Sequence, residues 1–146
     1  MMLGQDVIRG LIPHRGAMCL LDTVEYWDAE RVVCRTDQHR SPANPLSASA
    51  RLSSINGVEF AAQAMAVHGG LLAPAEAPPV VGLLVSLRDC VLHCARLDNL
   101  SSPLDIEARR VMGNSDVSMY DFAVCAGDIT LIEGRASVLL QRGAGR

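Results

Sequence analysis

Apolar and polar residues alternate over most of the second half of the chain. Leu104, Ile106 and Ala108, for example, are separated by charged residues. Such a period of two is typical of a strand with one buried and one solvated face. The pattern predicts four strands here, the last three as a meander: Val80–Cys94, Leu104–Met112, Val117–Ala126 and Ile129–Leu140. Nearer the N-terminus, Leu20–Trp27 and Arg31–Asp37 are predicted to form a hairpin.

A different pattern occupies Ser54–Leu72, which is apolar on nearly every helical face and rich in alanine. A helix of this kind is expected to be buried. Gly69 and Gly70, with Pro74 just beyond, predict its end. A short turn or helix is also expected around Asp6–Gly10.

One apolar helix and a sheet of about six strands can bury each other's apolar surfaces if the sheet curls around the helix. We therefore predict an α+β fold, an antiparallel sheet wrapped around one long central helix, in a single domain over residues 1–146. Such a sheet leaves edge strands with unpaired backbone groups, and pairing with a second copy covers them. The expected state is a dimer or a higher even oligomer.

Composition excludes several classes of function. All thirteen basic residues are Arg, against sixteen acidic residues, and the net charge of −3 favours no nucleic-acid partner. We find no secretory signal in Met1–Leu11 and no apolar run long enough to span a membrane. Five cysteines without a repeated spacing predict no disulfide framework and favour the cytoplasm. Because Cys90 and Cys94 share one strand face and His93 takes the other, no metal site is expected.

Two polar residues interrupt the apolar helix. Glu59 and Gln63 are four residues apart, so they lie on one helical stripe. A buried carboxylate is costly unless it meets a partner, which indicates that Glu59 faces a cavity. The alternative is structural: Asn56 caps the helix, and Glu59, three residues later, completes a capping box.

The loop of residues 38–51 that precedes this helix contains His39, and an imidazole can act as a general base near neutral pH. The other histidines favour structural roles. His14 is expected to form a hydrogen bond at the entry to the first strand, His68 lies on a different face of the helix from Glu59, and His93 is expected in a strand.

The order of motifs resembles the beta-hydroxyacyl-ACP dehydratases of fatty acid synthesis. The resemblance rests on Leu11-Ile12-Pro13-His14-Arg15, Leu20-Leu21-Asp22, His39 with Pro42-Ala43-Asn44-Pro45, and Glu59-Phe60-Ala61-Ala62-Gln63. The loop around Ser41-Pro42-Ala43 lacks the family's glycine. In this it resembles more closely the predicted hot-dog 3-hydroxyacyl-ACP dehydratases of aryl polyene clusters. The resemblance implies a hot-dog fold and no cofactor, the substrate being carried on the phosphopantetheine of acyl carrier protein.

It also implies site residues. His39 and Glu59 are the expected catalytic pair, completed across the dimer, with His39 removing the C2 proton and Glu59 assisting loss of the C3 hydroxyl. Gln63 corresponds to the family's glutamine one turn later and is expected to bind substrate. Backbone amides at the helix start, near Asn56, Gly57 and Val58, are expected to stabilise the enolate-like oxygen, with Gly57 permitting close approach.

The predicted function is therefore a 3-hydroxyacyl-ACP dehydratase with acyl carrier protein as partner. Arg96, Arg109 and Arg110 are candidate contacts for the carrier. Two alternatives remain open at this stage. One is a hot-dog acyl thioesterase in which Glu59 alone activates water. The other is a non-catalytic hot-dog subunit that forms a heterodimer with an active partner.

Overall fold

Six strands form one antiparallel sheet in the order β1-β2-β4-β5-β6-β3. The computed structural model describes residues 2–12, 18–49, 51–74, 80–113 and 117–142. The strands are β1 (Thr23–Trp27), β2 (Arg31–Thr36), β3 (Val80–Leu92), β4 (Leu104–Gly113), β5 (Val117–Ala126) and β6 (Ile129–Arg142). The predicted N-terminal hairpin and C-terminal meander are both confirmed.

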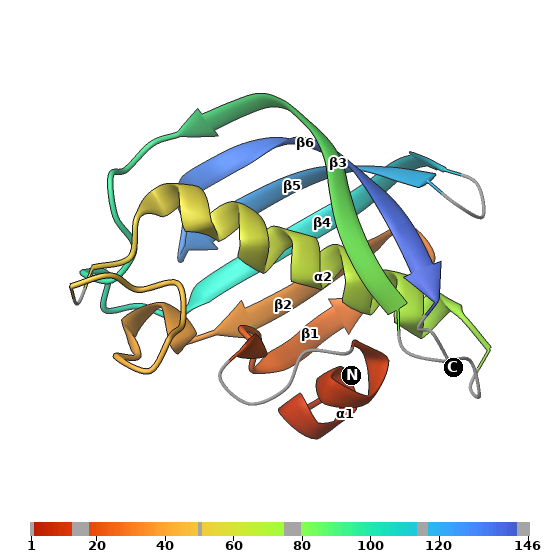
Figure 1. The fold of residues 1–146 in the computed structure, drawn as a ribbon, viewed down its shortest axis with the longest axis horizontal. Coiled ribbons are helices and arrows are strands. Elements are labelled where there is room, and N and C mark those ends of the chain that lie inside the picture. Colours follow the sequence, from red (N-terminus) through yellow and green to blue (C-terminus); the bar gives the residue numbers. More distant parts are fainter. Residues whose placement is uncertain (1, 13–17, 50, 75–79, 114–116, 143–146) are drawn as a thin grey trace.

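The long helix α2 (Gly57–Leu72) lies along the concave side of this curled sheet (Figure 1). It follows a single 3-10 turn, η3 (Ser54–Asn56). From Gly57 to Gly69 every residue except Glu59 is buried, as the all-round apolar pattern predicted. The predicted α+β arrangement, with a sheet wrapped around one helix, is confirmed.

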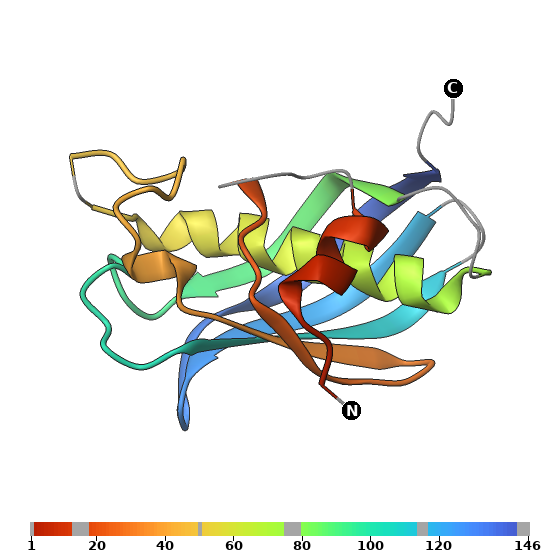
Figure 2. The same cartoon turned by 90° about the horizontal axis from the view of Figure 1, so that it is seen from below.

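A short helix, α1 (Gln5–Leu11), packs beside the C-terminal half of α2 (Figure 2). A Cβ atom added at Gly70 would lie 3.2 Å from the Leu11 Cβ, so the small residue allows the two helices to approach. Just before α1, Leu3 exchanges two backbone hydrogen bonds of 2.8 Å with Val24 of β1. This bridge covers part of one sheet edge.

The opposite edge is β3, which pairs with β6 on one side. Among the side chains of β3 that the structure describes, six are apolar and exposed: Leu83, Leu84, Val85, Leu87, Val91 and Leu92. Edge strands that expose apolar side chains in this way commonly pair with another chain in other proteins.

One local prediction was wrong, and the structural alternative for Glu59 fails. The first strand begins at Thr23 rather than Leu20, because the Leu20 amide donates to the Gln63 side chain instead of to a neighbouring strand. The capping box is also absent: Asn56 has helical dihedral angles and makes no side-chain cap hydrogen bond. The 3-10 turn, rather than a side-chain cap, leads into the helix.

Candidate active site

His39 lies in the one-turn 3-10 helix η2 (Gln38–Arg40), directly after β2. Its side chain is fully buried. The Nε2 atom is 3.0 Å from the backbone oxygen of Leu100, in the connection between β3 and β4. A carbonyl oxygen can only accept, so the neutral ring carries its proton on Nε2.

The other ring nitrogen, Nδ1, is buried and has no hydrogen-bond partner. In this tautomer it holds a lone pair that can accept a proton. Leaving a buried acceptor unsatisfied costs about 1–3 kcal/mol, and native proteins seldom retain one without a reason. His39 is thus a buried imidazole with one ring nitrogen left unpaired.

Electrostatics keep this imidazole uncharged. Burial lowers the pKa of His39 below its ordinary value. The hydrogen bond to Leu100, the Asp37 charge and the backbone of Ser102 oppose that effect only in part. The Arg40 guanidinium lowers the pKa further. The ring is therefore neutral, and able to take up a proton, at neutral pH.

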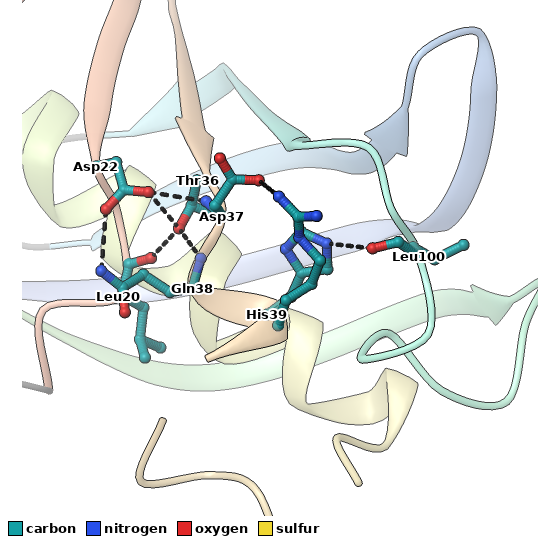
Figure 3. A network of polar contacts seen from close by, with 8 residues as sticks. Leu20, Asp22, Thr36, Asp37, Gln38, His39 and Leu100 are labelled. Atoms are coloured by element: carbon teal, nitrogen blue, oxygen red, sulfur yellow. Dashed lines mark hydrogen bonds and ion pairs between the residues drawn. The ribbon is translucent and has the colours of Figure 1, made fainter. Parts of the chain in front are cut away.

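A polar network holds the turn that carries His39 (Figure 3). The Asp22 carboxylate accepts hydrogen bonds from the Asp37 amide at 2.8 Å and from Nε2 of Gln38 at 3.0 Å. The Thr36 hydroxyl accepts from the Gln38 amide at 2.9 Å and donates to the Leu20 oxygen at 2.6 Å. Asp22, the last residue of the Leu20-Leu21-Asp22 motif, thus fixes the position of the turn.

The loop after η2 is fastened to it by Asn44. The buried Asn44 side chain donates to the Gln38 oxygen at 2.9 Å and accepts from the Leu46 amide at 2.9 Å. This explains the asparagine of the Pro-Ala-Asn-Pro segment. It fixes the return of the loop towards α2.

Glu59 lies in the first turn of α2 and is partly exposed, in contrast to the buried residues around it. Within the described part of one chain, the His39 ring bonds Leu100 and its Nδ1 has no partner, so this ring does not hydrogen-bond Glu59. By the sequence analysis, the pair is expected to be completed across two subunits. It stays a prediction.

The side-chain amide of Gln63 forms hydrogen bonds with the backbone of the segment before β1. Its Oε1 accepts from the Leu20 amide at 3.0 Å, and its Nε2 donates to the Met18 oxygen at 2.8 Å. The side chain is buried. Gln63 therefore anchors this segment to α2, and a direct role in substrate binding stays a prediction.

The three residues expected to stabilise the substrate oxygen lie at the start of α2. Asn56 lines a pocket, Val58 is buried, and Gly57 faces the core. A Cβ atom at Gly57 would lie 2.2 Å from Cδ1 of Ile132 on β6. The close approach at this glycine is thus made by a core side chain. Binding of the substrate oxygen by these amides stays a prediction.

The other histidines lie elsewhere. His14, with Pro13 and Arg15 of the same motif, is outside the described residues. His68 is buried and bonds Tyr120 and Asp28. His93 lies just after β3 rather than within it and pairs with Glu133 at 2.8 Å.

The three arginines predicted to contact a carrier do not form one group: Arg109 and Arg110 are neighbours on β4, and Arg96 lies in the connection before it. Arg109 lies opposite Arg31 in the register of β4 and β2, at the start of β2, whereas His39 follows the other end of that strand. Arg110 lies next to Arg109, and its backbone amide donates to Glu30 in the β1–β2 turn. Arg96 lies in the β3–β4 connection that also supplies Leu100. Only Arg96 is thus beside the candidate site.

Two features lay beyond sequence reasoning. Leu100 acts through its backbone oxygen, which no residue pattern reveals. Arg51, in the loop before α2, is one arginine among thirteen, and no motif in the sequence distinguishes it.

Groups of three or more metal-binding side chains are absent from the described residues, and none of their helices is long and apolar enough to cross a membrane.

Comparison with solved structures defines the class. The fold matches the dehydratase heterocomplex ApeI:P from Xenorhabdus doucetiae with a TM-score of 0.83 and 19% identity, over 93% of this chain and 91% of that chain. It also matches a mutant thioesterase from Pseudomonas aeruginosa (TM-score 0.56, 15% identity, 82% and 80% covered) and a thioesterase from Haemophilus influenzae (0.57, 12%, 84% and 80%). No curated protein matches significantly. The protein is thus of the hot-dog class, in which the buried helix and curled sheet of Figure 1 recur.

The family follows from the sequence itself. The ApeP-like family model, described as ApeP dehydratase, matches residues 7–143. The chain belongs to the ApeP-like dehydratase family. The resemblance to hot-dog dehydratases inferred from the motifs is confirmed.

Proposed function

We propose that this chain is a cytoplasmic (3R)-hydroxyacyl-[acyl-carrier-protein] dehydratase that acts in fatty acid or aryl polyene biosynthesis. The observation that carries the proposal is His39, a buried neutral imidazole with its proton fixed on Nε2 and a bare lone pair on Nδ1. Membership of a dehydratase family supports it. The elimination is redox-neutral, so we propose no cofactor beyond the phosphopantetheine arm of the substrate.

In the proposed reaction, His39 Nδ1 takes the proton from C2 of the 3-hydroxyacyl chain. The electrons of that C–H bond form the C2=C3 double bond as the C3–O bond breaks. Glu59 of the partner subunit gives its proton to the departing hydroxyl, which leaves as water. Because Nδ1 is buried in one chain, the acyl chain must displace the side chains that cover it.

The proposed site needs two subunits, and β3 offers the surface that joins them. Its free edge and its six exposed apolar side chains are covered if two hot-dog subunits pair along this strand. We propose a pair of identical copies as the working unit. A heterodimer with another hot-dog subunit is the second candidate, because the solved structure matched above is a heterocomplex.

The test follows alkene absorbance and free thiol release together, using a 3-hydroxyacyl carrier thioester as substrate. Wild type should form the alkene without releasing thiol. His39→Ala and Glu59→Gln should each lose about 10²- to 10⁴-fold in rate, the usual contribution of a positioned acid or base. His93→Ala and Glu133→Gln, which alter an exposed pair, are the matched controls and should keep full activity.

Thiol release that survives His39→Ala would replace the proposal with a thioesterase. No turnover by the chain alone, restored when a second hot-dog subunit is added, would assign it to a heterodimer. Equal alkene formation by wild type and His39→Ala would overturn the proposed base.

Mixing the two inactive variants tests the shared site. A mixed dimer of His39→Ala and Glu59→Gln chains contains one intact pair, so random exchange should restore about a quarter of wild-type activity. No recovery, despite exchange shown by mass spectrometry, would place both catalytic groups in one chain.

A further inference from the structure

A pocket of about 340 Å³ lies where the loop before α2 meets the β3–β4 connection. Its wall is a short antiparallel pairing. The Ser54 amide donates to the Ala95 oxygen at 3.0 Å, and the Leu97 amide donates to the Leu52 oxygen at 2.8 Å. The residues that line the pocket are Leu46, Ala48, Arg51, Ser53, Asn56, Ala95 and Arg96.

The pocket adjoins the segments that carry both proposed catalytic residues. On one side, the turn that begins with Ala95 and Arg96 ends at Leu100, whose oxygen binds His39. On the other side, Asn56 lies three residues before Glu59. A ligand that fills the pocket therefore lies next to the candidate site.

Two guanidinium groups give the pocket a positive charge. Asp98 accepts from Nε of Arg96 at 3.0 Å and also from its Nη2, and it accepts from the Leu52 amide at 2.8 Å. These hydrogen bonds fix the Arg96 guanidinium through Nε and Nη2 and do not use its Nη1. Arg51 is exposed and forms no ion pair with any residue that the structure describes. It therefore supplies most of the net charge.

The rest of the lining suits an uncharged arm. Leu46, Ala48 and Ala95 are apolar, while Ser53 and Asn56 can exchange hydrogen bonds with amides. Phosphopantetheine has the same composition: a dimethyl group and two amides, ending in a phosphate. Arginine forks match phosphate geometry well.

We propose that this pocket binds the phosphopantetheine part of the thioester substrate, with Arg51 and Arg96 contacting its phosphate. The inference rests on the proposed function. Carrier protein and coenzyme A share this arm, so both sources are admitted, and the thioester end points towards His39 and Glu59.

The experiment compares three 3-hydroxyacyl thioesters: on N-acetylcysteamine, which lacks the phosphate, on coenzyme A, and on the carrier protein. Arg51→Ala should lower kcat/KM about tenfold for the two phosphorylated substrates, mainly through KM, and leave the N-acetylcysteamine thioester unaffected. Arg51→Lys should recover part of the loss. Arg35→Ala, an exposed arginine on the outer side of β2, is the matched control.

Arg96→Ala is expected to act in the same direction, but it also leaves Asp98 without its partner, so Arg51 is the decisive position. Equal losses on all three substrates, or no loss on any, would overturn the inference. A loss confined to the carrier thioester would also overturn it, since that outcome assigns Arg51 to the protein surface of the carrier.

Binding of free 4′-phosphopantetheine, measured against pantetheine by calorimetry, separates the inference from the proposed function. If wild type dehydrates the N-acetylcysteamine thioester but gains nothing from the phosphate, the function stands and the inference fails. If no thioester is dehydrated, yet Arg51→Ala weakens phosphopantetheine binding about tenfold, the inference stands and the function fails.

Discussion

Two fully buried histidines, His39 and His68, lie on different elements of the fold and are treated differently by it. His68 has both ring nitrogens satisfied: Nε2 is 2.8 Å from the Asp28 oxygen, and Nδ1 is 2.8 Å from the Tyr120 hydroxyl. His39 has one nitrogen satisfied and one bare. Burial lowers the pKa of both rings, so the difference lies in hydrogen bonding rather than in charge.

The two hydrogen bonds of the His68 ring have a structural role. The Asp28 carbonyl fixes the proton on Nε2, so Nδ1 accepts from Tyr120. Burial raises the pKa of Tyr120 to about 12, which keeps the hydroxyl a donor at all ordinary pH values. One imidazole thus ties α2 to the β1–β2 turn and to β5. The fully paired His68 ring joins three elements of the fold, whereas the proposed role of His39 uses the nitrogen that the fold leaves unpaired.

The largest expected effect is the contrast between two alanine substitutions, one at each histidine. His68→Ala leaves the Tyr120 hydroxyl and the Asp28 carbonyl buried without partners, so the free energy of unfolding should fall by about 2–4 kcal/mol in urea titrations. His39→Ala should cost about 1 kcal/mol, because it also removes an unsatisfied atom. Activity per folded molecule should fall only in His39→Ala. Similar stability losses in both variants would erase the distinction.

A smaller effect is expected at Asp22, which holds the turn that carries His39. Asp22→Asn replaces one acceptor oxygen by an NH2 group, and we expect kcat to fall about tenfold with KM unchanged and a stability loss of about 1 kcal/mol. The acid limb of the pH–rate profile should not move, since Asp37 and Arg40, rather than Asp22, supply the charges near the ring. Asp105→Asn on the outer sheet face is the control. A shifted limb would show that Asp22 acts on the ring directly.

The smallest effect concerns pH. Both histidines have folded-state pKa values below the ordinary 6.5, so the unfolded chain binds protons near that pH that the folded chain does not. Their contribution to stability is complete above pH 6.5, declines as the pH falls below it, and levels off below the folded values. Each contributes at most about 1.4 kcal/mol per pH unit. The free energy of unfolding of His39→Ala, measured by urea titration below pH 6.5, should therefore fall less steeply with decreasing pH than that of wild type. An equal pH dependence in the two proteins would contradict the lowered pKa of His39.

The sequence by itself determined the layered fold. The all-round apolar pattern of α2 and the alternation in β4 follow from which faces meet water, and that preference is local to each element. Glu59 stood out because it is a charged residue in an otherwise apolar helix, which its neighbours along the chain suffice to show. His39 was paired with it through the resemblance of the surrounding motifs to a known family.

Tertiary structure alone decided the details of the site. Leu100 binds His39 through a backbone oxygen, Gln63 is drawn to the Met18–Leu20 segment, and Ile132 fills the space beside Gly57. Arg51 becomes distinctive only when the Leu52–Ser54 segment pairs with the β3–β4 connection and creates a pocket around it. These contacts join residues that are dozens of positions apart, and a hydrogen bond or a cavity depends on where the second partner lies in space.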